Sequence, residues 1–286
     1  MNEVDIRTCL QKEATNSGTS WDYILKLYAL EGIIRRLSLH LQAGELVVRG
    51  SLITRAWVQP HYRPVDDIDF LADYARDAKR GLSFINEILA YDLQDFITYQ
   101  VNAISVVPTW VDTPLPGERL FVPTTVFGQN LTLQIDLAYD DPLVPSSVQR
   151  TYPMLIPVWK APIYTIRPEL ACAWKVHGLF EFWGRRSTAW EMKDLYDIYL
   201  ISQAFPFDKA HFSEALRMAF SHRKTPLSVY KRVLEGTFGQ SKGTEKAWGR
   251  FYAKRDGRVI VANHKELLEK VRFFLDDYFL DFLREE

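Results

Sequence analysis

The sequence predicts an α+β fold, in which a mixed β-sheet with flanking helices is followed by a helical C-terminal domain. Between residues 46 and 138, short segments alternate apolar and polar residues, which is the pattern of half-buried strands. After a proline-rich connector at residues 142–168, the pattern becomes helical to the end of the chain. We therefore expect a first domain over residues 1–155 and a second, helical domain over residues 156–286.

The expected strands come from short apolar or alternating segments. Leu46–Val48 is a short apolar strand, and Asp67–Leu71 alternates polar and apolar residues as a half-buried strand does. Residues 96–138 carry further strand signals. Within them, Val126–Leu131 indicates the turn of a β-hairpin.

Helices are expected on both sides of these strands. Residues 1–43 have a helical pattern, with Gly44 suited to stop the helix, and residues 83–92 form a further helix. Pro168 stands at the first-turn position that proline favours in helices. Thr188–Glu191 matches a capping box, which would open the next helix.

The composition excludes several classes of protein. The chain of 286 residues is 47% hydrophobic and 25% charged, with a net charge of −1, as expected for a folded globular protein. It contains only two cysteines, Cys9 and Cys172, which excludes a disulfide scaffold and a cysteine-rich zinc site. No apolar run approaches the roughly 20 residues of a membrane span. The acidic N-terminus does not resemble a signal peptide, so we expect a cytoplasmic protein with no membrane partner.

Residues 221–258 form a basic segment, with ten Lys and Arg against three Asp and Glu, an excess of seven positive charges. Such an excess on a balanced chain predicts a polyanion-binding surface. Its aromatic residues could stack on bases or belong to the core of the helical domain; they are Tyr230, Phe238, Trp248, Phe251 and Tyr252. A solvated helical face is the alternative interpretation of the charge.

Three carboxylates in strand-like segments are candidate metal ligands. Asp67 and Asp69 are two residues apart, so on a strand they share a face at a separation of about 7 Å. Asp136 lies in Leu131–Leu137, opposite to the inward-facing apolar residues, and could join them from a neighbouring strand. Carboxylate oxygens suit hard divalent cations, with water and substrate phosphates completing the ligand shell. The alternative is an ordinary exposed strand face.

A glycine–serine turn is a candidate phosphate site. Gly50 and Ser51 follow a strand and precede a helix start, where backbone N–H groups and the helix dipole favour phosphate. Gly50 permits close approach of a ligand, and Ser51 offers a hydroxyl group. The spacing of a Walker A loop is absent.

The helical half contains one further cluster. Lys175 could reach a phosphate, and Asp194 and Asp197 are three residues apart, so they share a helix face. One of these acids could orient the lysine or act as a base. The alternative is a set of salt bridges between helices.

The order of these motifs resembles that of the AbiEii/AbiGii-type toxin nucleotidyltransferases, a family of the polymerase-β-like nucleotidyltransferase superfamily. The resemblance runs from about Leu46 to Leu200, with a weaker match in the helical tail. The superfamily signature is a hydrophobic-Gly-Ser turn, a hydrophobic-flanked Asp-x-Asp and a third acid on a later strand. The matching residues are Gly50, Ser51, Asp67, Asp69 and Asp136. The resemblance implies a nucleotidyltransferase-like sheet.

Features of the AbiEii type are also matched. Arg55 stands where the family has an arginine on the first helix, and Arg63 precedes the aspartate pair. Ala173-x-Lys175 resembles the Ala-Glu-Lys helix of the family, although Trp174 replaces the acid. Lys193–Asp197 resembles its Lys-Asp-x-x-Asp motif. The 15-residue gap between Ser51 and Asp67 is slightly longer than usual, which suggests a longer helix or loop over the pocket.

The resemblance implies metal-dependent transfer of a nucleoside monophosphate from an NTP to an acceptor. Asp67 and Asp69 would hold two Mg²⁺ ions, or Mn²⁺, at the α-phosphate. Asp136 would be the third ligand or the base that deprotonates the acceptor hydroxyl.

The remaining matched residues would bind the nucleotide, through Gly50, Ser51, Arg55, Arg63 and Lys175. Asp194 or Asp197 would position the lysine or serve as an alternative base.

The family and the basic segment favour RNA as the acceptor, in particular a tRNA 3′ end, and a toxin role with a cognate antitoxin. Transfer to a small molecule or to a protein hydroxyl is the second hypothesis. The third is a catalytically silent protein that binds only a nucleotide or a partner.

Overall fold

The computed structural model describes residues 1–58, 63–111, 115–184, 192–231, 239–253, 260–261 and 263–285. The chain forms two compact units. The first unit comprises Met1–Ala56, Pro64–Asp141 and Ser147–Ile166, and the second comprises Trp57–Arg63, Pro142–Ser146 and Arg167–Glu286.

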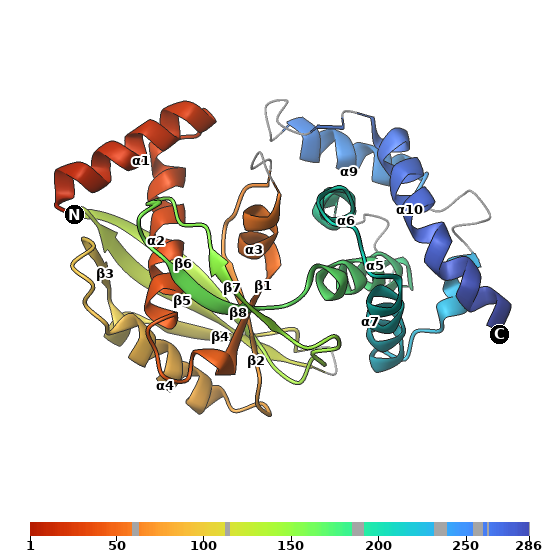
Figure 1. Ribbon diagram of the computed structural model, residues 1–286, viewed down its shortest axis with the longest axis horizontal. Coiled ribbons are helices and arrows are strands. Elements are labelled where there is room, and N and C mark those ends of the chain that lie inside the picture. The colour runs from red at the N-terminus through yellow and green to blue at the C-terminus, as the bar shows by residue number, and fades with distance from the viewer. Residues whose placement is uncertain are drawn as a thin grey trace. The chain divides into compact units, whose positions relative to one another are not determined.

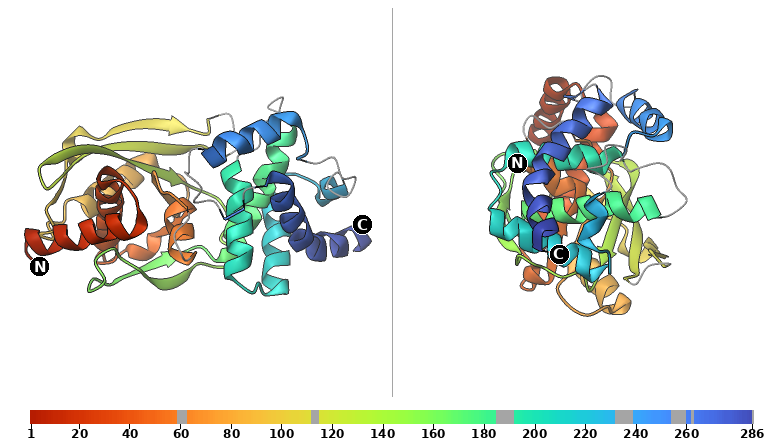
Figure 2. Two further views of the ribbon diagram at one scale, coloured as in Figure 1. Left: turned by 90° about the horizontal axis from the view of Figure 1, so that it is seen from above. Right: turned by 90° about the vertical axis from the view of Figure 1, so that its right-hand side faces the viewer.

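The first unit is built around a β-sheet (Figures 1 and 2). Its strands are β1 (Leu46–Arg49), β2 (Ile68–Ala72), β3 (Ile97–Tyr99), β4 (Ser105–Thr109), β5 (Gly117–Val126), β6 (Gln129–Ala138), β7 (Val148–Tyr152) and β8 (Ala161–Thr165). Its helices are α1 (Glu3–Ser17), α2 (Trp21–Leu37), α3 (Gly50–Trp57) and α4 (Ala78–Leu89), with the 3₁₀ turns η1 (Ala43–Glu45) and η2 (Val101–Ala103).

The sheet is mixed, as the sequence predicts. Its strand order is β3-β5-β6-β2-β1-β8-β7, with β4 paired to β5 beside β3. β2 pairs with β6 and β1 with β8 in parallel, whereas the other neighbours are antiparallel. The β5–β6 hairpin turns at Phe127 and Gly128, whose φ angles of 48° and 80° match a tight turn of the primed type. The predicted hairpin is thereby confirmed.

Helix α2 forms the centre of the packing in this unit. It is buried almost all round and contacts β5, β6 and β8. On β5, Leu120 and Val122 are buried, whereas Arg119 and Phe121 on the opposite face are only half-buried. One face of this part of the sheet therefore belongs to the core, and the other remains accessible.

Two predictions about helix boundaries are corrected by the structure. The first helical region consists of two helices separated at Gly18, which has a left-handed φ of 61°, and α2 starts after the capping residue Ser20. The second of these helices ends at Leu37, and Gly44 lies in η1. The reason is that Leu39 and Leu41 are exposed, so the segment after Leu37 has no buried face to hold a helix.

The helix expected at 83–92 spans Ala78–Leu89 because Asp77 caps it, accepting hydrogen bonds from the N–H groups of Lys79 and Arg80.

The proline-rich connector contains two strands that its sequence pattern does not predict. β8 adjoins β1 at the pair Val48–Thr165, and β7 pairs with β8 along its length. Pro162 lies at the other end of β8, beyond the point where β1 pairs, so its missing N–H group interrupts no bond to β1. The first unit consequently extends to Ile166, past the boundary expected at residue 155.

The second unit is helical, as predicted, and opens with the helix expected at Pro168. Its helices are α5 (Pro168–Gly184), α6 (Met192–Ala204), α7 (Lys209–His222), α9 (Lys242–Ala253) and α10 (His264–Glu285), with the 3₁₀ turn η3 (Leu227–Tyr230). Phe180, Phe220, Tyr230 and Phe279 form an aromatic core. The capping box at Thr188–Glu191 lies outside the described residues. Across the described parts of both units, no helix has the length and apolar character to cross a membrane.

A buried ion pair joins α2 to the loop before β3. The Arg36 guanidinium donates to both carboxylate oxygens of Asp95, at 2.7 and 2.8 Å, and both side chains are 1% exposed. Arg36 also donates from Nε to the carbonyl of Tyr91 at 2.8 Å. The Tyr91 carbonyl carries no charge, so Asp95 is the close counter-ion of Arg36. Removal of Asp95 alone would therefore leave a buried positive charge without its counter-ion.

We therefore expect Asp95→Ala to lower the free energy of unfolding by about 3 kcal/mol or more. Denaturation by urea, followed by circular dichroism, measures the change. Asp281→Ala, which removes the partner of the exposed Lys209, should leave the unfolding midpoint nearly unchanged. If both substitutions lowered the free energy of unfolding equally, burial of the Arg36–Asp95 pair would not govern its contribution to stability.

Candidate functional site

A row of charged residues crosses the accessible face of the sheet. Asp69 on β2 is the register partner of Arg49 on β1 and of Asp136 on β6. Asp136 in turn is the register partner of Arg119 on β5. Register partners point to the same face of a sheet. Two acids therefore stand side by side at the centre of the row, with an arginine on each flank; we call these four residues the carboxylate row.

Arg119 binds Asp136 with both arms of its guanidinium. Nε lies 2.8 Å from Oδ1 and Nη2 lies 2.7 Å from Oδ2. The hydrogen bond to Asp136 raises the pKa of Arg119; burial acts in the opposite direction, and the charges of Asp136, Asp67 and Asp69 raise it further. The three predicted carboxylates therefore lie around one positive charge.

Gly50 and Ser51 begin α3 directly against these acids. Gly50 has a φ of 74°, and a β-carbon built on it would lie 2.6 Å from Cγ of Asp69 and collide with the carboxylate. Only glycine both adopts this left-handed φ without strain and leaves room for the Asp69 carboxylate. Ser51 donates from Oγ to Oδ1 of Asp67 at 3.2 Å. The predicted Gly-Ser turn therefore lies at the aspartate pair, where it holds Asp67 and leaves space for Asp69.

Gln134 connects the aspartate pair to Asp136. Its side-chain amide donates to Oδ2 of Asp67 at 3.3 Å and to Oδ1 of Asp136 at 3.1 Å. Gln134 precedes Asp136 by two residues on β6, so both point to the same face. The amide thus fixes the orientation of two carboxylates at once.

The donor set fits a hard divalent cation, because carboxylate oxygens gather here on a half-buried face. In the arrangement as it stands, however, both oxygens of Asp136 bind Arg119. In the part of the chain that the structure describes, no group of three His, Cys, Asp or Glu side chains is placed to hold a metal ion. Asp67 and Asp69 are therefore the candidate ligands, and Asp136 could join them only by exchanging Arg119 for the ion.

Arg55 is placed in the interior of the first unit. It is 5% exposed. Burial raises the pKa of Tyr23, and the charge of Arg55 acts in the opposite direction. Burial also raises the pKa of Glu31 to about 8, again against the charge of Arg55. The predicted role of Arg55 in nucleotide binding stays a prediction.

The other predicted residues meet in the second unit, on α5 and α6. Lys175 lies 3.0 Å from Oδ1 of Asp194 and 2.8 Å from Oδ2 of Asp197. Nε of Arg63 donates to Oδ1 of Asp197 at 2.8 Å. The inter-helix salt bridges considered as the alternative are thus present, and they orient the lysine.

Burial and charge separate the roles of the two acids. Asp197 is fully buried, and although burial raises its pKa, the charges of Arg63 and Lys175 lower it below the ordinary value. An acid held in this state suits positioning better than proton abstraction. Asp194 is 19% exposed, so a ligand can reach it more easily. Burial lowers the pKa of Lys175, but Asp194 and Asp197 outweigh it, so the ammonium group stays charged at neutral pH.

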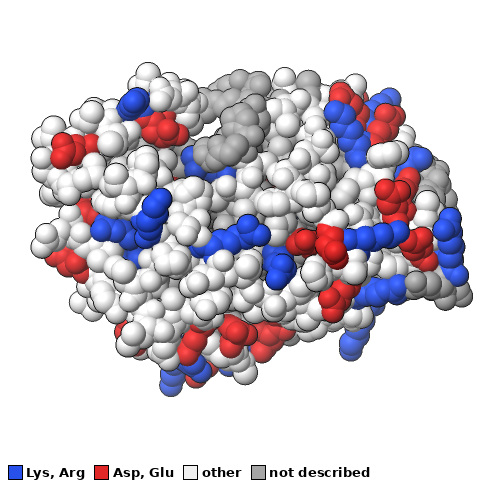
Figure 3. Space-filling model, in the orientation of Figure 1, with Lys and Arg blue, Asp and Glu red and all other residues white. Residues whose placement is uncertain are grey.

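The aromatic residues of the basic segment belong largely to the core. Tyr230, Trp248 and Phe251 are buried, Tyr252 is half-buried, and Phe238 lies outside the described residues. The first three are therefore unable to stack on bases. On the face seen in Figure 3, positive and negative side chains are interspersed.

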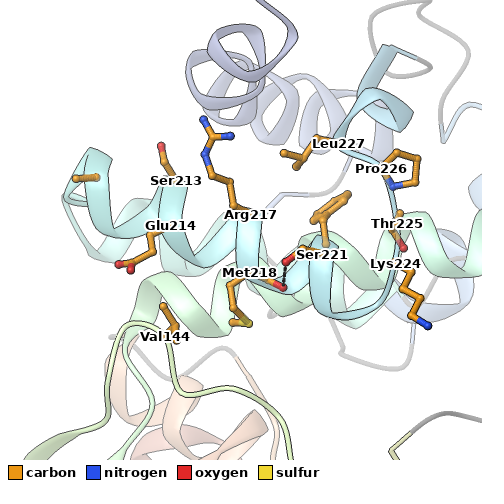
Figure 4. Close-up of a pocket in the computed structure, with 12 residues that line it drawn as sticks. Val144, Ser213, Glu214, Arg217, Met218, Ser221, Lys224, Thr225, Pro226 and Leu227 are labelled. Carbon is orange, nitrogen blue, oxygen red and sulfur yellow. Dashed lines mark hydrogen bonds between the residues drawn. The ribbon is translucent and has the colours of Figure 1, made fainter. Parts of the chain in front are cut away.

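A cavity of about 970 Å³ lies along α7 in the second unit. Ser213 and Arg217 point from one side of the helix, and Glu214 and Met218 from the other, beside Val144 (Figure 4). No predicted site residue lines it. Its mixed lining indicates no particular ligand.

Sequence reasoning missed Arg119, Gln134 and the flanking position of Arg49. The sequence does contain the information that places Arg119. The tight turn at Phe127 and Gly128 fixes the register of the hairpin, and this register sets Arg119 opposite Asp136. The position of Arg49 beside Asp69 depends on the pairing of β1 with β2, across an intervening helix, which local patterns do not give.

Comparison with known proteins gives a family and a fold. Residues 32–270 match the family described as the nucleotidyl transferase AbiEii toxin, type IV TA system. The chain is similar to the crystal structure of a candidate nucleotidyltransferase from H. pylori, with 13% identity, 93% of this chain and 99% of that chain covered and a TM-score of 0.50. That likeness shows the fold. No curated protein matches the chain.

Two further solved structures have lower scores. JHP933 from Helicobacter pylori has 13% identity and a TM-score of 0.43, with 90% of this chain and 95% of that chain covered. An antigenic nucleotidyltransferase-like protein from Paracoccidioides brasiliensis has 14% identity and a TM-score of 0.39, with 84% and 92% covered. At these scores, neither likeness carries an argument.

Replacement of Gly50 tests its contact with Asp69. We expect Gly50→Ala to lower the free energy of unfolding by about 2 kcal/mol or more, from left-handed strain together with the collision. Gly128→Ala is the matched control, because Gly128 has a similar φ of 80° with nothing within 4 Å of the added carbon. Strain alone should then cost about 1 kcal/mol. Urea denaturation of both variants measures the difference, and equal losses would contradict the proposed collision.

The ion pairs of Asp197 predict a dependence of stability on pH. The pKa of Asp197 is lowered in the folded chain, so its charged form stabilises the fold. This contribution is fully present when the pH is above the ordinary aspartate pKa of about 3.9, and it is lost as the pH falls toward the lowered pKa. Asp197→Asn should therefore unfold more easily than the wild type by about 3 kcal/mol between pH 5 and 7. The difference should shrink below about pH 4. Urea titrations from pH 3 to 7 measure it, and a constant difference would rule out titration of Asp197.

Proposed function

Because the chain belongs to the AbiEii family of nucleotidyltransferase toxins of type IV toxin–antitoxin systems, we propose that it transfers a nucleoside monophosphate from an NTP to RNA, at the 3′ end of a tRNA. The observation that carries this proposal is the carboxylate row with Asp67 and the Gly-Ser turn beside it. Such an arrangement suits phosphoryl chemistry, which relies on positioning and on neutralisation of charge.

We assign Asp67 and Asp69 as the residues that hold Mg²⁺, with Mn²⁺ as an alternative ion and Asp136 as the third ligand. When bound, the metal supplies neutralisation of charge on the attacking and leaving oxygens of the phosphoryl group. The support for this assignment is the gathering of three carboxylates around one cation and the bridge that Gln134 makes between two of them.

The chain's own groups would bind and orient the nucleotide. Ser51 and the amide groups at the start of α3 are suited to the outer phosphates, since Gly50 allows close approach. In the second unit, Lys175 is the candidate cation for phosphate because its neighbouring acids keep it charged. Asp197 would position Lys175, and Asp194, the more exposed of the two acids, is the one that could accept a proton.

The acceptor proposal draws support from the exposed side of α9. Lys242, Lys246 and Arg250 recur at intervals of four residues and are exposed, so they form one stripe along the helix. The opposite side, with Trp248 and Phe251, is buried. A stripe of this kind can follow a phosphate backbone without reading its bases. RNA is therefore a better match to this part of the basic segment than an aminoglycoside, which carries positive charge.

The family also suggests an antitoxin, and we propose that a cognate antitoxin controls the activity. We further propose that the protein acts in the cytoplasm, in keeping with the proposed tRNA substrate.

Substitution of Asp69 tests the reaction directly. Purified protein is incubated with Mg²⁺, total tRNA and each α-³²P-labelled NTP in turn. The wild type is expected to label RNA with at least one nucleotide. Asp69→Asn should lower the rate about 100-fold or more, because it removes a charge from the centre of the row at nearly constant shape.

Asp73→Asn is the matched control for this experiment, because Asp73 is exposed just beyond β2. It should label RNA at the wild-type rate. Absence of label on RNA with every nucleotide, while NTP and Mg²⁺ still bind, would shift the proposal to a small-molecule or protein acceptor. Loss of nucleotide binding as well would favour a catalytically silent protein that binds a partner.

A further inference from the structure

We propose that Arg119 is an internal competitor of the divalent cation for Asp136, so that the site binds the cation with full strength only when Arg119 releases this carboxylate. The inference rests on the proposed metal dependence and adds a regulatory residue to the same site. It follows from the contacts of Arg119, its position on the sheet and its difference from the other arginines nearby.

Arg119 and a metal ion would need the same oxygens of Asp136. Both oxygens of Asp136 accept hydrogen bonds from Arg119, at 2.8 and 2.7 Å, and the Asp136 side chain is 4% exposed. A metal ion of the Mg²⁺ type needs an oxygen at roughly 2.0–2.1 Å with its lone pair free. Since both oxygens of this buried carboxylate already bind the guanidinium and Oδ1 also accepts from Gln134, an ion would have to compete with Arg119 for them.

The charge of Arg119 also opposes a metal ion at the other two carboxylates. The positive charge of Arg119 lies close enough to Asp67 and Asp69 for both to raise its pKa. The same charge repels a divalent cation at those two carboxylates. Because an arginine stays protonated in proteins, this opposition persists at every physiological pH.

Arg119 is better placed than Arg49 to leave the carboxylate row. Arg119 lies on the half-buried face of β5 and its side chain is 34% exposed, so it can move into solvent without opening the core. Gln134 still donates to Oδ1 of Asp136 and would keep that carboxylate in place after Arg119 leaves. Arg49, on the other flank of the row, pairs with Asp141 at 2.8 Å and thus has an acid outside the row. Arg119 is therefore the arginine suited to exchange with the ion.

A matched control is available on the same strand. Arg76 binds Glu118 at 2.6 Å, and Glu118, adjacent to Arg119 in sequence, points to the opposite face of the sheet. Substitution of Arg76 removes an arginine–carboxylate pair of the same kind without touching the carboxylate row. Any general effect of losing a positive charge from the first unit will therefore appear in this control.

The test is binding of Mn²⁺ alone, measured by electron paramagnetic resonance of the free ion with the full-length protein. Arg119→Gln should bind Mn²⁺ about tenfold more tightly than the wild type, or better, because a nearby positive charge is removed and Asp136 is freed. Arg76→Gln should bind as the wild type does. Asp69→Asn should lose binding in either background.

The outcomes separate this inference from the proposed function. Equal or weaker binding by Arg119→Gln, with loss of binding in Asp69→Asn, would overturn the competition and leave the metal site standing. Absence of Mn²⁺ binding in the wild type and in Arg119→Gln alike would overturn both the competition and the metal dependence.

Should Arg119→Gln fail to fold, the competition can be measured on the wild type by nuclear magnetic resonance of the Arg119 Nε–H group, assigned with Arg119→Lys. Saturating Mg²⁺ should shift this signal toward that of a solvent-exposed arginine, and an unchanged signal would overturn the proposal.

Discussion

The parallel pairing of β2 with β6 joins two strands that are far apart in the chain, and the arrangement of the site depends on it. The register sets Asp69 beside Asp136, while Phe70 and Leu137, the next pair, fall on the opposite face and are buried. A slip of one residue would exchange these faces, placing carboxylates in the core and apolar side chains on the accessible side. The burial that stabilises the sheet therefore also fixes the chemistry of its exposed face.

Three buried aspartates are each held by a cation. Asp95 has Arg36, Asp136 has Arg119, and Asp197 has both Arg63 and Lys175. Burial of a lone charged carboxylate is costly, so an acid that stays charged in the interior needs such a partner. The pairs differ in exposure, because Arg36 is fully buried whereas Arg119 is about one third exposed. That difference separates an ion pair which serves the fold from one which lies where a ligand can compete for it.

The chain belongs to a family of nucleotidyltransferase toxins. The predicted site residues are divided between the two compact units of its structure. The first unit supplies the aspartates and the Gly-Ser turn on a rigid sheet. The second unit supplies a lysine whose charge and direction are fixed by two acids on the adjacent helix. In both settings the residues that we propose to act on the nucleotide are oriented by neighbouring side chains, and such preorganisation is what the proposed phosphoryl transfer needs.

Features that depend on local physics can be predicted from the sequence alone. Alternation of apolar residues predicts the strands around Asp69 and Asp136, and the turn residues predict the hairpin. Gly50 was expected to allow close approach of a ligand, and the structure adds that its missing side chain leaves space for Asp69. Features that depend on distant partners emerge only in the folded chain. From the sequence, Pro162 was interpreted as part of a linker, whereas in the structure it lies in β8, which pairs with β7 at one end of the sheet. Trp248 was a candidate for stacking on a base, but in the structure it is buried. The role of Arg119 depends on Asp136, the carboxylate opposite it in the hairpin, because the effect of a charge depends on which charges lie beside it.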